Sequence, residues 1–365
     1  MNNNKKLRHI EFWSGGKMNR PLFGFSLGSY FPAKRYLGAE KLLVDGLHVT
    51  PEMIIVEDFL DDYERMYKET IDVEQDLTLV ASPYTGIPWM EAILGCEIIG
   101  GQSSFIAEPM HLSWEQIGDI TFDPDNLWVK KYMEFIEKLI ILSKGRFPIG
   151  QPILRGVSDM MSCLRGHEQF AIDYILYPDE SIVLQSKLTK FYIQFIKYQQ
   201  EWLNEFSGGT GFGFYSLWTP DKAIWFQEDA CALLSPKLYA KYLRKANEEI
   251  SRVYPFNLIH LHPASLFALD EILTIEELKV IQINKDVGGP TIEELIPYFI
   301  KVVEKGKRLL VWGDLSLDEV KLICRKVPMK GVCLHIVAED TNIAINISIF
   351  INKYRNSDNN MYNCI

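Results

Sequence analysis

The sequence predicts an α/β protein built as a (β/α)8 TIM barrel with an N-terminal extension. Short segments rich in β-branched and aromatic residues alternate with longer segments of helical periodicity along the whole chain. About eight such units, without a fixed-period repeat or a Pro/Gly/Ser-rich linker, favour a closed barrel over an open sheet. We expect residues 1–19 to form the extension, residues 20–354 a single barrel domain, and the Asn-rich residues 355–365 a disordered tail.

The expected strands are short apolar runs bounded by polar or turn-forming residues. In chain order they are PLFGFSLG (21–28), DLTLVASP (76–83), PILRGVSD (152–159), GFGFYSLW (211–218), IWFQEDA (224–230), NLIHLHP (257–263), LKVIQINKD (278–286), RLLVWGDL (308–315) and VCLHIVAED (332–340). The expected helices lie between them, at 50–70, 125–144, 179–206, 235–253, 291–307 and 316–327.

Residues with helix-capping chemistry support several of these helices. Ser235 and Ser316 stand where an N-cap is expected, and Thr291 precedes Glu294 at the spacing of a capping box. Gly306 stands where a helix is expected to end. These positions predict helix starts after 235, 291 and 316.

The composition excludes several classes of protein. Lys and Arg number 38 against 48 Asp and Glu, which gives a formal charge of −10 and does not favour binding to nucleic acid or to an anionic membrane. No apolar run approaches the ~20 residues of a membrane span. Six cysteines without a CxxC pair do not make a disulfide framework, so we expect a cytoplasmic protein.

Polar residues gather where the expected strands end, which in a barrel of this kind is the place of the active site. The alternative is that each one only caps the helix that follows. Six such positions together favour an enzyme acting on a small molecule: 158–159, 227–229, 260–262, 284–286, 313–314 and 339–340.

Two histidines on one expected strand form a candidate metal site. His260 and His262 are two residues apart, so on a strand their imidazoles lie on the same face. Catalytic zinc commonly has three protein ligands and one open position. We expect Glu339, at the end of the last strand and across the same barrel mouth, to be the third ligand. Cys333 on that strand is a second candidate, but it lies about 20 Å lower at the usual strand rise and is better explained as a buried residue. The alternative is a pair of histidines hydrogen-bonded within the core.

The stretch between 211 and 230 supplies candidate substrate-binding residues. Tyr215, Trp218 and Gln227 could line a pocket for a flat or apolar ligand, although aromatic residues are more often part of the core. Asp229 is a candidate catalytic residue, since a carboxylate that ends an apolar strand needs a partner.

Several segments resemble the uroporphyrinogen decarboxylase superfamily, over residues 15–352. They are GSYFP (28–32), DLTLVASPYTGIPWMEAILGCEI (76–98), LRGHEQFAIDYILYPDE (164–180), FQEDACALLSPKLYAKYLRK (226–245), NLIHLHP (257–263) and RLLVWGDL (308–315). The resemblance implies the (β/α)8 fold. The decarboxylase branch has an arginine where this chain has Ser29, and an acid near Ser82, where this chain has none.

The chain is closer to the methylcobamide-dependent methyltransferase branch of this superfamily. That branch holds zinc with an HxC pair and a later cysteine, positions that correspond to His260, His262 and Glu339. The resemblance implies a zinc-assisted methyltransferase with Asp229 and His260 as catalytic residues. It also implies a corrinoid methyl carrier that is not permanently bound and is presented by a separate corrinoid protein. The alternatives are a decarboxylase with an altered substrate and a non-catalytic tetrapyrrole- or corrinoid-binding protein.

Overall fold

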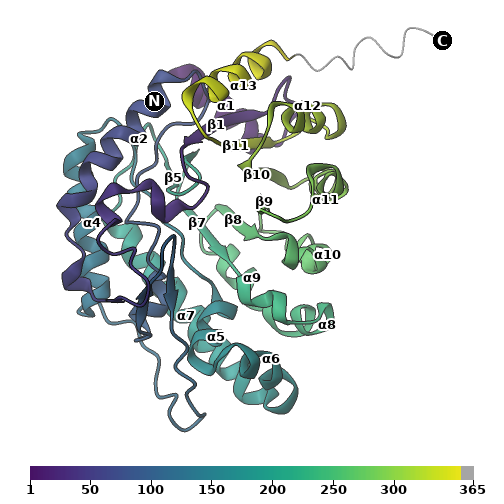
Figure 1. The fold of residues 1–365 in the computed structure, drawn as a ribbon. Helices are drawn as coiled ribbons and strands as arrows, with labels where there is room; N and C mark the ends of the chain where they lie inside the picture. Colours follow the sequence, from purple (N-terminus) through teal and green to yellow (C-terminus); the bar gives the residue numbers. More distant parts are fainter. Residues whose placement is uncertain (355–365) are drawn as a thin grey trace.

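The structure is a computed structural model that describes residues 1–354, so the expected tail at 355–365 lies outside the described residues. The architecture is mixed α/β, as predicted, around a six-stranded parallel sheet in the order β1-β11-β10-β9-β8-β7 (Figure 1). Its strands coincide with six of the nine predicted ones. They are β1 (Leu22–Leu27), β7 (Ala223–Gln227), β8 (Phe256–Leu261), β9 (Val280–Lys285), β10 (Arg308–Asp314) and β11 (Val332–Ala338).

Two further predicted strands, 76–83 and 152–159, form extended segments rather than regular strands, and the last three residues of the second begin the helix Val157–Arg165. Isolated parallel bridges join Ala81 to Ile149 and Arg155 to Gln227, the last residue of β7. On the other side, the Leu77 amide donates to the Phe23 carbonyl of β1 at 3.2 Å. Prolines at 83, 148 and 152 explain the missing ladder, because proline has no N–H to donate.

The prediction of one strand over 211–218 is wrong. This stretch forms an antiparallel hairpin of β5 (Thr210–Phe212) and β6 (Leu217–Thr219), with Ser216 at a positive φ of 51° in the turn. A small antiparallel sheet stands apart from it and consists of β2 (His48–Val49), β3 (Ile98–Gly100) and β4 (Phe105–Ala107).

Helices follow most strands, and α10, α11 and α12 lie along the outer side of the parallel sheet (Figure 1). Ser235 caps α8, and Ser316 and Thr291 form the predicted capping boxes with Glu319 and Glu294. The helix predicted over 50–70 begins only at Leu60. The helices are α1 (Asn3–Ser14), α2 (Leu60–Asp72), α3 (Trp89–Ile93), α4 (Leu127–Ser143), α5 (Val157–Arg165), α6 (His167–Leu176), α7 (Pro178–Trp202), α8 (Pro236–Leu238), α9 (Arg244–Ser251), α10 (Leu269–Ile272), α11 (Ile292–Glu304), α12 (Leu317–Lys326) and α13 (Thr341–Lys353).

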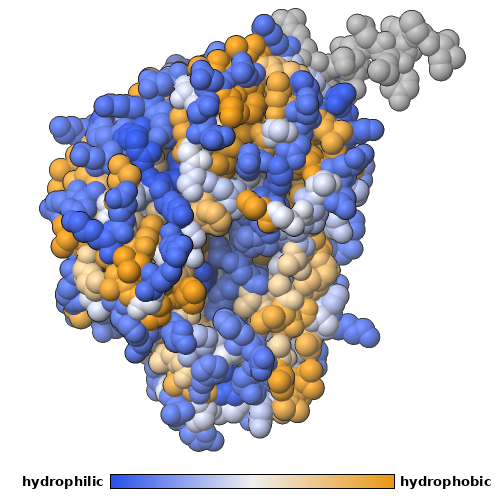
Figure 2. Space-filling model, in the orientation of Figure 1, coloured by the Kyte–Doolittle hydropathy of each residue, from blue (hydrophilic) through white to orange (hydrophobic). Residues whose placement is uncertain are grey.

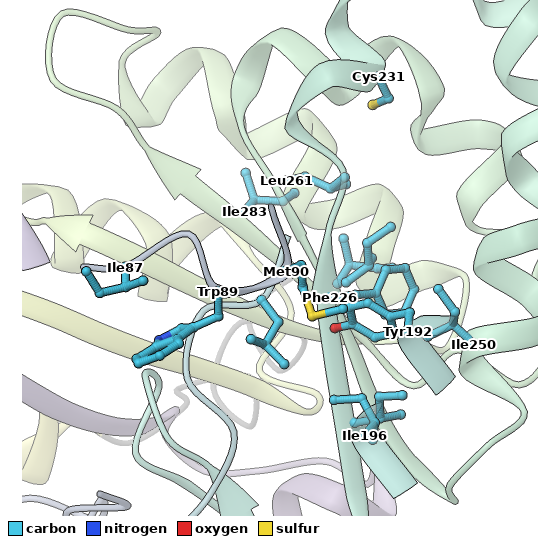
Figure 3. Close-up of a cluster of buried hydrophobic side chains, with 14 of the residues drawn as sticks. Ile87, Trp89, Met90, Tyr192, Ile196, Phe226, Cys231, Ile250, Leu261 and Ile283 are labelled. Carbon is cyan, nitrogen blue, oxygen red and sulfur yellow. The ribbon is translucent and has the colours of Figure 1, made fainter. Parts of the chain in front are cut away.

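Buried side chains form two cores, one on each face of the sheet. The outer core packs the sheet against the helices, and Figure 3 shows Phe226 of β7 beside Tyr192 and Ile196 of α7. The inner core lies on the opposite face and is smaller. Its strand residues include Leu258 and Leu310, two positions whose neighbours along the strand, Ile259 and Leu309, belong to the outer core. This alternation is the two-residue period of a strand buried on both faces.

The N-terminal helix closes the inner core at the amino ends of the strands. Phe12 and Trp13 of α1 are buried there, and the Trp13 indole donates to the Trp218 carbonyl of β6 at 2.8 Å. Residues expected to be an extension therefore pack into the same core as the sheet. We call this end of the molecule the floor, defined by Phe12, Trp13, Met18, Leu22, Leu77, Phe212, Leu258, Val280, Leu310 and Cys333.

One disulfide, Cys96–Cys163, joins the segment after α3 to α5. This disulfide departs from the expectation drawn from the cysteine pattern. Cys231, Cys324 and Cys333 are free and buried. Within residues 1–354, no helix is both long enough and apolar enough to cross a membrane.

Candidate functional site

The two predicted histidines lie side by side at the carboxyl end of β8, together with Asp229. Asp229 follows β7, the strand that pairs directly with β8 and places Gln227 opposite His260. Asp229 Oδ1 lies 4.0 Å from Nε2 of His260 and 3.9 Å from Nε2 of His262. One ligand atom from each of the three residues lies within 4.8 Å of the others. This is the spacing of a group that can close around one metal ion.

The other nitrogen of each imidazole is already engaged. His262 Nδ1 lies 2.8 Å from Asp286 Oδ1, and His260 Nδ1 is hydrogen-bonded to Gln282 Oε1. Because a carboxylate and an amide oxygen only accept, both Nδ1 atoms donate, and in a neutral ring Nε2 keeps its lone pair. Metal-bound histidines are usually oriented in this way by an acceptor on the second nitrogen.

The surroundings shift the pKa values of the two histidines in opposite directions. Burial, followed by the nearby charge of His262, lowers the pKa of His260 to about 4, so its ring is neutral at pH 7. Burial also acts against a proton on His262. There the hydrogen bond that His262 Nδ1 donates to Asp286 and the charge of Asp229 outweigh burial and raise the pKa of His262 above its usual value. Burial therefore keeps the His260 ring neutral, whereas the carboxylates around His262 favour a proton on that ring, with which a metal would compete.

A cavity of about 300 Å³ opens beside the histidines, and Figure 2 shows a recess near the middle of the face drawn in Figure 1. The aromatic rings of Tyr30, Phe214 and Trp312 lie against one another along it, with ring centres 4.9 and 5.3 Å apart. Arg155 and Asn284 add polar groups to the lining. A mostly apolar wall with a few polar groups is typical of a small-molecule site.

Two of the three predicted substrate-binding residues line this cavity. The Tyr215 hydroxyl donates to Gln282 at 2.8 Å and lies 2.9 Å from His260 Nδ1, so it also holds the histidine. Gln227 lines the cavity and donates to Asp229 Oδ2 at 2.7 Å. Trp218 does not line it. Its indole is buried on β6 and donates to the Phe206 carbonyl at 2.9 Å, which corrects the expected substrate contact.

Glu339, the expected third ligand, is not brought to the histidines. It is exposed after β11, and two strands, β9 and β10, separate β11 from β8. Asp229 lies beside the two histidines instead. Cys333 is fully buried at the floor, as expected, and burial raises the pKa of its thiol.

Gln282, Arg155 and Glu91 were not singled out from the sequence, and Asp286 was noted only within the polar strand end 284–286. Gln282 and Asp286 support the two imidazoles, and Arg155 pairs with Glu91 at 3.0 Å beside Asp229. Gln282, Asn284 and Asp286 alternate along β9 and its end, which places them on the same face as the paired histidines. That alternation of polar residues in a buried strand was the available signal.

The fold is shared with a known enzyme. The structure is similar to that of a methyltransferase from Methanosarcina mazei, with a TM-score of 0.62. The sequences are 13% identical over 95% of this chain and 97% of that one, so the likeness shows the fold alone. No known family model matches the sequence, and no curated protein is significantly similar to it.

Proposed function

We propose that His260 Nε2, His262 Nε2 and Asp229 Oδ1 bind one zinc ion. Three ligands, two of them neutral nitrogens when the metal is bound, match the donor set of catalytic zinc with one position left open. The hydrogen bonds from both Nδ1 atoms support this assignment more than any other observation, because they leave both Nε2 atoms available within 4.0 Å of Asp229 Oδ1.

We also infer that the sheet closes into the expected eight-stranded barrel. The extended segments 77–82 and 148–155 lie between β1 and β7 and are joined to both sides by main-chain hydrogen bonds or bridges. In such a barrel the proposed zinc ligands and the cavity lie at the carboxyl-end mouth.

The function that this site supports best is methyl transfer of the methylcobamide-dependent type, within the uroporphyrinogen decarboxylase superfamily. Zinc, when bound, would act as a Lewis acid that makes a thiol or hydroxyl of the acceptor more nucleophilic. The protein's own groups would bind and orient the acceptor: the aromatic wall would exclude water, and Asp286 and Gln282 would keep both imidazoles in place. The corrinoid carrier, a separate corrinoid protein and the cytoplasmic location stay predictions.

The proposal is tested with methylcobalamin and a panel of thiol and alcohol acceptors, followed by visible absorbance. We expect the methylcobalamin spectrum to disappear with the wild-type protein and to stay unchanged with Asp229→Ala or His260→Ala. Trp218→Phe, which alters a buried residue outside the cavity, is the matched control and is expected to keep the activity. Metal-free decarboxylation of a carboxylated substrate, or corrinoid binding without turnover, would favour one of the two alternatives instead.

A further inference from the structure

Asp159, in the first turn of α5, holds the main chain of the proposed ligand Asp229. Its Oδ2 accepts from the Asp229 amide at 3.1 Å, and its Oδ1 accepts from the Ala230 amide at 2.9 Å. Both amides begin the 3₁₀ turn Asp229–Leu233, where N–H groups have no partner within the turn. One buried carboxylate therefore satisfies two donors and fixes the place at which the turn leaves β7.

A second carboxylate, that of Glu228, connects the same two segments from the other side. Glu228 accepts from the amides of Val157 and Ser158 at 3.2 and 2.7 Å, at the start of α5. The Gly156 amide donates to the Gln227 carbonyl at 2.8 Å between the two pairs. The segments 156–159 and 227–230 are thus tied together at three points, so neither can shift without breaking buried hydrogen bonds.

The side chain of Asp229 is held separately from its main chain. Gln227 donates to Oδ2 of Asp229, which leaves Oδ1 facing the two imidazoles. The position of Oδ1 therefore depends on Asp159 for the backbone and on Gln227 for the rotation of the carboxylate.

We propose that Asp159 is a positioning residue that sets the distance of Asp229 Oδ1 from the two histidine nitrogens and thereby sets the affinity and geometry of metal binding. The inference rests on the proposed function, since it takes Asp229 as a ligand. A metal site needs its ligand atoms placed to within a fraction of an ångström. Removing an outer hydrogen-bond partner of a ligand typically costs about 10–100-fold in metal affinity.

The test compares Co²⁺ binding by the metal-free full chain, recorded through the visible absorption bands of the ion, for Asp159→Asn and Asp173→Asn. Asparagine keeps the shape of Asp159 but turns an NH₂ group toward one of the two main-chain donors. Asp173 on α6 is the matched control: it is a fully buried carboxylate that binds Arg165 and Gln169 and makes no contact with the site. Thermal unfolding without metal is measured for each variant.

We expect Asp159→Asn to raise the Co²⁺ dissociation constant at least about tenfold and to shift the absorption bands. Asp173→Asn should lower the unfolding temperature and leave affinity and bands unchanged. Wild-type affinity and bands in Asp159→Asn would overturn the inference, because Asp159 would then serve stability alone. If wild-type protein binds neither Co²⁺ nor Zn²⁺, the proposed function fails instead.

A second variant decides the question if Asp159→Asn does not fold. Asp159→Glu keeps a carboxylate but places its two acceptor oxygens one methylene further along the side chain, so the Asp229 and Ala230 amides would have to shift to reach them. We expect weaker Co²⁺ binding, and unchanged binding would overturn the inference.

Discussion

The two ends of the parallel sheet are built from different side chains. At the floor, apolar residues of β8, β9 and β10 pack against Phe12 and Trp13 of the N-terminal helix. At the opposite end, β8 and β9 finish in histidines, amides and a carboxylate that are hydrogen-bonded to one another. One strand therefore carries a packing residue at its start and a candidate ligand at its end, as Leu258 and His260 show on β8.

This difference predicts that stability and metal binding can be changed separately. Floor residues stabilise the fold through buried apolar surface, which does not depend on a ligand. The polar residues at the other end cost free energy to bury unless each is paired, so their arrangement indicates selection for chemistry rather than for stability. Each of the following variants shows whether stability and metal affinity change independently or together.

The largest effect is expected from truncating the floor. Phe12 is fully buried in α1, so Phe12→Ala should lower the free energy of unfolding by about 3–5 kcal/mol. Denaturant unfolding measures this loss, and Phe12→Leu, a milder change in volume, should cost less than about 1.5 kcal/mol. Zinc affinity per folded molecule should be unchanged. A parallel loss of zinc affinity would show that the floor shapes the site.

Acid should destabilise α1, the helix that covers the floor, through a buried histidine. Burial lowers the pKa of His9 to about 4, below its unfolded value of about 6.5. The unfolded chain therefore binds this proton first, and stability that is present above pH 6.5 is lost as the pH falls toward 4. Between pH 6.5 and 5 the loss is about 2 kcal/mol, and His9→Gln should remove it in denaturant unfolding at both pH values. An unchanged pH dependence in His9→Gln would contradict the buried neutral form.

His335 should add to this acid sensitivity. Burial, followed by the charge of Arg35, lowers the pKa of His335 to about 3. Because its folded pKa also lies below the unfolded value, its contribution has the same sign and extends to lower pH. The two histidines lie in different elements: His335 of β11 is hydrogen-bonded to Ser26 of β1 at 2.8 Å, and His9 is hydrogen-bonded to the Lys5 carbonyl within α1.

At the opposite end, Asp286→Asn should weaken metal binding without a comparable loss of stability. The variant replaces the carboxylate that orients His262, and such partners typically contribute about 10–100-fold to affinity. Zinc competition against a chromophoric chelator measures the change. Equal zinc affinity in wild type and Asp286→Asn would contradict the assignment of His262 as a ligand.

The smallest effect is expected from Trp218→Phe. The variant loses one buried hydrogen bond to the Phe206 carbonyl, worth about 1 kcal/mol of stability. It should leave zinc affinity and the Michaelis constant for the acceptor unchanged. A changed Michaelis constant would instead support the contact between Trp218 and the substrate that the sequence suggested.

The sequence was sufficient to predict the strands whose side chains alternate regularly and the pairing of His260 with His262 on one face. It did not predict Asp229 as their neighbour, because the turn after β7 is directed by Asp159, which lies 70 residues earlier in the chain. Glu339 looked equivalent by spacing, yet the strand order separates it from β8 by two strands. Trp218 was assigned to a single strand, whereas residues 210–219 fold back as a hairpin beneath α1.

The most direct test of the central claim is the zinc content of the purified chain and of single alanine variants, measured by elemental analysis after dialysis. We expect one zinc per wild-type chain, its loss in His260→Ala, His262→Ala and Asp229→Ala, and its retention in Glu339→Ala. A wild-type chain that holds no zinc at micromolar metal, or one that loses zinc in Glu339→Ala and keeps it in Asp229→Ala, would contradict the site described above.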